Sequence, residues 1–194
     1  MGDGARLTVT IDLPAWAESL ESMGTPVGDE EERLRLALEL SRLNVERATG
    51  GPFGAAVFDA VEGRLVSVGV NSVVRLNNSV LHAEVVACMR AQTRLGSFTL
   101  AASETGSGGH VLYSSCEPCA MCLGAILWSG VTRVVYAARR DDAEAVHFDE
   151  GPVFPETYAY LRRRGIRIGA GGLREEAREV LQRYQALGGS VYNG

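Results

Sequence analysis

The chain contains no lysine, so all 19 of its basic residues are arginine. They are outnumbered by 24 acidic residues, and the formal net charge is −5. A chain of this kind lacks the extended positive surface with which nucleic-acid-binding proteins hold phosphates. We therefore expect no nucleic-acid partner.

Long apolar runs are also missing. No segment approaches the roughly 18 consecutive apolar residues of a membrane helix. Residues 1–10 show no basic stretch followed by an apolar core, which a signal peptide would have. These absences predict a cytoplasmic protein without membrane contact. The 194 residues are 46% apolar and 22% charged, which is typical of one globular domain.

Hydrophobic periodicity and turn residues predict alternating strands and helices. Strands are expected at residues 53–58, 65–74, 110–114, 131–137 and 166–168. Helices are expected at residues 30–48, 82–95, 118–128, 155–164 and 173–187. This alternation favours an α/β layer fold with parallel strands covered by helices. We expect one domain over residues 30–187, an N-terminal extension over 1–29 and a tail over 188–194.

Three of the four cysteines lie within seven residues, at positions 116, 119 and 122. In a cytoplasmic chain, such crowding favours metal or redox chemistry over a disulfide framework. Cys119 and Cys122 share one helix face at a spacing of three, and the positive helix N-terminus favours their thiolates. Cys116 precedes Pro118 and is expected at the strand end, in a supporting role.

Two thiolates need a third ligand, and the chain offers only three histidines. His82 is the best candidate because it opens a predicted helix, as Cys119 does, and because Glu84 follows it closely. Two cysteines and one histidine leave a fourth position open, which is typical of a catalytic zinc site. A water there is activated by Zn²⁺, and Glu84 can move its proton.

Two short motifs resemble the signature of the cytidine-deaminase-like superfamily of zinc deaminases. They are His82-Ala-Glu84 and Pro118-Cys-Ala-Met-Cys122. The resemblance implies a three-layer α/β/α fold around a mixed sheet of about five strands. It also implies Zn²⁺ bound by His82, Cys119 and Cys122, with Glu84 as the proton carrier.

Within that superfamily the chain is most similar to bacterial guanine deaminases, some of which also accept ammeline. Residues 50–53, the Asn71 region and residues 115–126 and 141–150 carry this resemblance. The tRNA adenosine deaminases usually have a lysine in the last segment. The resemblance implies hydrolysis of guanine to xanthine and ammonia, with Glu150 as a second proton shuttle and Asp149 as its neighbouring alternative.

The guanine deaminases also suggest how the substrate and a second subunit would be held. The residues expected to contact the base are Phe53, Asn71, Ala83, Trp128 and Tyr192. A homodimer is expected, in which residues 191–193 of one subunit close the active site of the other.

Several alternatives stay open. The substrate could be cytosine, guanosine or an s-triazine instead of guanine. A non-catalytic zinc module would use Cys116 as a fourth ligand, and a redox protein would use Cys116 with Cys119. Residues 141–150 could also be only a solvated acidic loop.

Overall fold

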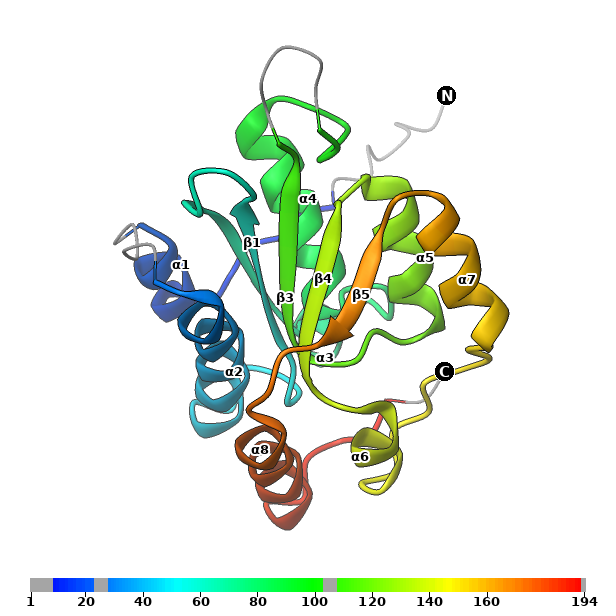
Figure 1. Ribbon diagram of the computed structural model, residues 1–194. Helices are drawn as coiled ribbons and strands as arrows, with labels where there is room; N and C mark the ends of the chain where they lie inside the picture. The colour runs from blue at the N-terminus through cyan, green and yellow to red at the C-terminus, as the bar shows by residue number, and fades with distance from the viewer. Residues whose placement is uncertain (1–8, 23–27, 103–107, 193–194) are drawn as a thin grey trace, which may run out of the picture.

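The structure is a computed structural model that describes residues 9–22, 28–102 and 108–192. Its five strands form one sheet (Figure 1). Its strand order is β2-β1-β3-β4-β5. The hairpin strand β1 is antiparallel to both β2 and β3, whereas β3, β4 and β5 run parallel. Their bounds are β1 Gly54–Asp59, β2 Leu65–Val70, β3 His110–Cys116, β4 Arg133–Ala138 and β5 Arg167–Ala170.

Helices cover both faces of this sheet (Figure 1). One face carries α1 (Ala15–Ser22), α2 (Glu30–Glu46) and α8 (Arg174–Ala186). The other carries α4 (Ala83–Leu95), α5 (Ala120–Ser129) and α7 (Pro155–Arg163). Two short helices, α3 (Val73–Leu76) and α6 (Arg140–Glu144), follow the ends of β2 and β4. The expected three-layer fold with a mixed five-stranded sheet is confirmed.

Strand β1 shows how the core is divided between the two faces. Ala56 and Phe58 pack into the apolar cluster beneath α2, whereas Ala55 and Val57 pack into the cluster beneath α4. All four side chains are at most 2% exposed. A strand buried on both sides needs apolar residues at every position, which explains why this segment shows no polar alternation.

The second predicted strand is too long. Strand β2 ends at Val70, and Val73–Leu76 form the short helix α3 instead. The Asn71 side chain accepts a hydrogen bond from the Val73 amide, and the Ser72 hydroxyl donates to the Val70 carbonyl. These local bonds end the strand although the valines that follow are good strand formers.

Helix α1 lies inside the expected N-terminal extension and was not predicted. Its Glu21 side chain is 3% exposed and accepts hydrogen bonds from the Val68 amide and from Arg90 and Arg94. The helix is thus tied to both β2 and α4. Among the described residues, no helix is long and apolar enough to cross a membrane.

Candidate metal centre and active site

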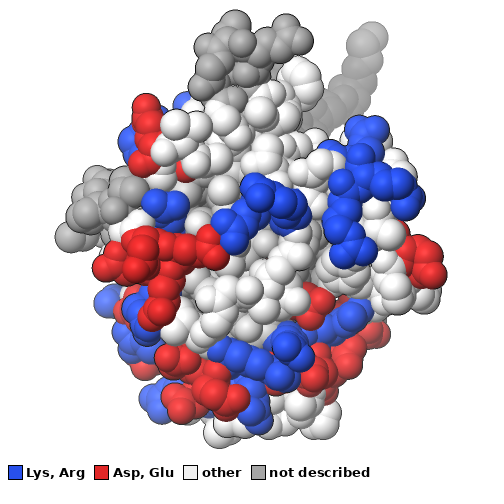
Figure 2. All heavy atoms as spheres, in the orientation of Figure 1, with Lys and Arg blue, Asp and Glu red and all other residues white. Residues whose placement is uncertain are grey.

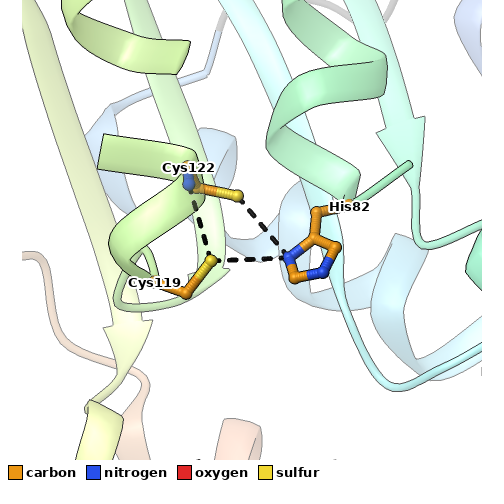
Figure 3. Close-up of side chains that lie close together, drawn as sticks. All are labelled: His82, Cys119 and Cys122. Atoms are coloured by element: carbon orange, nitrogen blue, oxygen red, sulfur yellow. Dashed lines mark hydrogen bonds between the residues drawn. The ribbon is translucent and has the colours of Figure 1, made fainter. Parts of the chain in front are cut away.

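Two helix N-termini meet at the end of the sheet where the parallel strands β3 and β4 finish. His82 is the N-cap residue of α4, and Cys119 is the N-cap residue of α5. Figure 3 shows the His82 ring pointing toward both sulfur atoms. Nδ1 of His82 lies 3.5 Å from Sγ of Cys119 and 3.7 Å from Sγ of Cys122. This edge of a sheet is where α/β folds commonly place their sites.

The three ligand atoms fit a zinc ion. Zn–S bonds of about 2.3 Å and Zn–N bonds of about 2.0 Å that meet at the tetrahedral angle separate sulfur and nitrogen by about 3.5 Å. Both observed distances agree with that value, and all three ligand atoms lie within 4.8 Å of one another. Within the described residues, only His82, Cys119 and Cys122 form such a group.

Hydrogen bonds from neighbouring groups favour the thiolate form of Cys119. Hydrogen bonding from Cys122 lowers the pKa of Cys119 to about 4, and the bonds to His82 and to the Cys122 amide act in the same direction against burial. The pKa of Cys122 is correspondingly raised, because the proton they share stays on its sulfur. A divalent cation would displace that proton and leave both thiols ionised.

Glu84 lies in the first turn of α4, beside the metal ligands, and is 6% exposed. Burial and the charge of Cys119 raise the pKa of Glu84 to about 6. Burial lowers the pKa of His82, but hydrogen bonding to Cys119 and the charges of Glu84 and Glu150 raise it overall. Such a concentration of negative charge is what a bound cation would neutralise.

Glu150 approaches the same site from the segment after α6 and is 7% exposed. Burial and the charges of Cys119 and Glu84 raise the pKa of Glu150 to about 8. Its backbone carbonyl accepts a 2.9 Å hydrogen bond from the Ala120 amide at the start of α5. Asp149 is exposed, and its carboxylate accepts a bond from the Gly151 amide. Burial therefore favours Glu150 over Asp149 as the second proton carrier.

Cys116 lies at the end of β3 and takes no part in the three-ligand group. Its thiol donates to the Arg139 carbonyl at 3.7 Å, and burial raises its pKa well above the ordinary value. The thiol is directed to this carbonyl, and Cys116 is not part of the group of ligand atoms that lie within 4.8 Å of one another. This arrangement supports an open metal site and argues against a closed structural one.

A pocket opens beside these groups. Six of its lining residues were expected as ligands, proton carriers or substrate contacts: Phe53, His82, Glu84, Cys119, Glu150 and Tyr192. Asp149, the alternative to Glu150, and Cys116, expected in a supporting role, line it as well. The Tyr192 ring lies 6.4 Å from the His82 ring and 5.2 Å from the Phe148 ring, measured between centroids. The tail thus reaches the pocket of its own chain. Asn193, the last residue of the expected lid, lies outside the described residues.

The other expected substrate contacts are placed differently. Asn71 is fully buried, and neither its Nδ2 atom nor the Tyr192 hydroxyl has a hydrogen-bond partner in the part of the chain that the structure describes. Ala83 is buried in the first turn of α4. Trp128 does not line the pocket, contrary to expectation. Its side chain is 82% exposed near the end of α5.

Two pocket residues were missed. Phe148 packs edge-on against Phe53, with 5.0 Å between ring centroids, and Glu117 lines the wall between Cys116 and Cys119. Glu117 stood within the cysteine motif, and Phe148 within the acidic segment next to Glu150. Their proximity to the motif residues was the available signal.

Comparison with known proteins places this site in a family. Residues 28–138 match the family model of the cytidine and deoxycytidylate deaminase zinc-binding region. The chain belongs to this family and is a hydrolytic deaminase with a three-layer fold.

Its relatives include guanine deaminases. The curated guanine deaminase of Bacillus subtilis (strain 168) is 38% identical over 128 residues, which cover 66% of this chain and 76% of the relative. A solved structure of the guanine deaminase from Nitrosomonas europaea superposes with a TM-score of 0.86 and 40% identity, covering 96% and 98% of the two chains. Another solved homologue, in complex with 8-azaguanine, matches with a TM-score of 0.87, 40% identity and the same coverage.

Proposed function

We propose that this protein hydrolyses guanine to xanthine and ammonia with a zinc ion held by His82, Cys119 and Cys122. The observation that carries the proposal is the pair of buried carboxylates, Glu84 and Glu150, beside a three-ligand metal group. The likeness to guanine deaminases along nearly the whole chain supports guanine as the base.

In the proposed reaction, water adds to the ring carbon that bears the amine, and the carbon–nitrogen bond then breaks. A bound zinc ion would supply the Lewis acid that lowers the pKa of a coordinated water toward about 7. Glu84 takes a proton from the water and passes it to the adjacent ring nitrogen. Glu150 gives a proton to the departing amine, since burial raises its pKa and keeps its acid form available near neutral pH.

Four residues in and around the pocket are proposed to hold the base. Phe53 offers a ring face for stacking, and Ala83 lies at the helix start between the metal ligand and Glu84. Among the described residues, the Nδ2 atom of Asn71 and the Tyr192 hydroxyl are buried without hydrogen-bond partners, and a purine has polar edges that would satisfy them. We propose these groups as the substrate contacts.

The tail is proposed as a lid. With Tyr192 in place the cavity measures only about 30 Å³, whereas small-molecule pockets generally enclose about 300 Å³ or more. Tyr192 must therefore move for a base to enter. In this structure Tyr192 lines the pocket of its own chain. We also propose that the protein forms a homodimer.

Figure 2 shows acidic and arginine side chains intermingled over the lower half of the visible face. Over that half no charge of one sign dominates, and the net charge of −5 favours a small substrate over a nucleic acid. Because the protein is proposed to act on a free base, we also propose that it works in the cytoplasm.

Ammonia release from guanine, guanosine, cytosine, adenine and ammeline tests the substrate. We expect zinc-loaded protein to release ammonia from guanine with xanthine as the product in equal amount. Turnover of another base with none of guanine would overturn the substrate but leave the deaminase chemistry in place.

A further inference from the structure

The turn between β3 and α5, residues 116–120, contacts the segment that carries Glu150 at three places. Its Ala120 amide donates to the Glu150 carbonyl at 2.9 Å. Its Glu117 carboxylate accepts one bond from the Arg140 amide at 3.1 Å and another, at the opposite oxygen, from the Tyr158 hydroxyl. The same short turn also contributes the metal ligand Cys119.

The two partners of Glu117 stand on either side of Glu150 in the chain. Arg140 is the first residue of α6, and Tyr158 lies on α7. Both ends of the segment that carries Glu150 are therefore hydrogen-bonded to the Glu117 carboxylate. The Arg140 guanidinium also donates to the Val153 carbonyl at 3.2 Å. Residues 140–158 are thus held by hydrogen bonds to Glu117 at both ends and by the Ala120–Glu150 bond between them.

Glu117 itself is poorly placed to exchange protons with a substrate. Although it lines the pocket, each of its carboxylate oxygens already accepts a hydrogen bond from the protein. Burial and the bond to Glu117 raise the pKa of Tyr158, so its hydroxyl remains a donor at neutral pH. The arrangement is a fixed brace, in which one group holds two elements together.

We propose that Glu117, through its hydrogen bonds to Tyr158 and Arg140, is a positioning residue that sets Glu150 at its working distance from the metal ligands. The inference rests on the proposed function, because it concerns the delivery of a proton to the departing amine. Positional errors of about 1 Å in a reacting group can reduce catalysis by about 100-fold, so such a brace has a measurable effect.

Steady-state kinetics with guanine test the brace. Tyr158→Phe removes one hydroxyl and keeps the ring, and Glu117→Gln leaves only one accepting oxygen. We expect each variant to lower kcat about tenfold, with KM changed less than twofold and zinc content per chain unchanged. Tyr160→Phe is the matched control, since Tyr160 lies on the same helix and is 45% exposed.

A double-mutant comparison separates positioning from a general structural effect. In a Glu150→Gln background, the change Tyr158→Phe should alter the remaining kcat less than twofold. An unchanged kcat in both single variants, or a tenfold loss that persists without Glu150, would overturn the proposal. Absence of turnover of guanine by the wild-type protein would refute the proposed function instead, and the same comparison would then use whichever base is deaminated.

Discussion

At the scale of single residues, Glu84 is the group on which the proposed chemistry depends most. Replacing Glu84 by Gln keeps the size of this buried side chain and removes its capacity to carry a proton. We expect kcat to fall by about 10²- to 10⁴-fold. Zinc content should stay the same, since the ligand group does not include Glu84. Ammonia release and metal analysis measure the two effects.

Glu62→Gln is a suitable control for that experiment, because Glu62 is an exposed glutamate whose side chain forms an ion pair with Arg64. Substantial turnover by Glu84→Gln would remove Glu84 from the mechanism. Loss of zinc with the activity would instead point to a structural role for the carboxylate.

The group formed by His82, Cys119 and Cys122 was predictable because its evidence is local. Cys119 and Cys122 are fixed by helical spacing, and His82 and Glu84 by their shared helix start. Trp128 was wrong because an aromatic residue in a helix that is apolar on all sides gives no signal of the direction it faces. Its 82% exposure follows from how α5 packs, which the sequence of α5 alone does not encode.

At the scale of elements, the tail is held by the end of α8. The Tyr184 hydroxyl donates to the Ser190 carbonyl at 2.7 Å, and its ring stacks on Phe148 with 6.0 Å between centroids. A Cβ atom at Gly189 would lie 2.3 Å from that ring, so the chain passes it closely. Tyr192, which we propose as the lid, follows two residues after Ser190.

Tyr184→Phe is therefore expected to loosen the lid while keeping the stacked ring. One lost hydrogen bond is worth about 0.5–1.5 kcal/mol, so KM for guanine should rise about two- to tenfold. Steady-state kinetics and limited proteolysis of the tail measure this. An unchanged KM, in a protein whose KM does rise with Tyr192→Ala, would show that Tyr184 does not hold the lid.

Helix α6 is joined to α8 by Asp142, which is 8% exposed and paired with Arg174 and Arg178. Burial raises the pKa of Asp142, but the bonds from Arg174 and the Arg139 amide outweigh it, and the net pKa is lowered. A lowered pKa in the folded state stabilises the protein above the unfolded pKa of about 3.9, and this stability is lost as pH falls through the folded value.

Urea unfolding of the wild type and Asp142→Asn at several pH values tests this sign. The wild type should be more stable at pH 7, and the difference should shrink as pH falls below about 4. A difference that grows toward low pH would contradict the assigned pairing.

Element prediction succeeded where periodicity was strong. Helix α2 begins as expected after Asp29, whose side chain accepts a 3.0 Å bond from the Glu32 amide. The prediction of elements failed where side-chain hydrogen bonds determine the backbone conformation. Asn71 and Ser72 end β2 early, and the unpredicted helix α6 forms where Asp142 accepts bonds from the Arg139 amide and from two arginines of α8.

At the scale of the whole molecule, the buried carboxylate of Glu21 is one of the links between helix α1 and the rest of the domain. Glu21→Gln removes the charge that pairs with Arg90 and Arg94, both of which are partly exposed and can be rehydrated. We expect the free energy of unfolding to fall by about 1–2 kcal/mol. Glu18→Gln, on an exposed face of the same helix, is the control.

The urea concentrations at which the wild type, Glu21→Gln and Glu18→Gln are half unfolded measure this effect. If Glu21→Gln and Glu18→Gln shift the midpoint equally, α1 is not anchored as the structure indicates. This long-range link was not predictable, because the partners of Glu21 lie 47 or more positions away in the chain.

The central claim is that the three-ligand site, loaded with zinc, deaminates guanine. The most direct measurement is kcat/KM for guanine, guanosine, cytosine, adenine and ammeline, before chelation, after complete zinc removal and after zinc is restored. The account predicts the highest kcat/KM for guanine, loss of activity on chelation and its return with zinc. Undiminished turnover in metal-free protein, or a preference for cytosine over guanine, would contradict it.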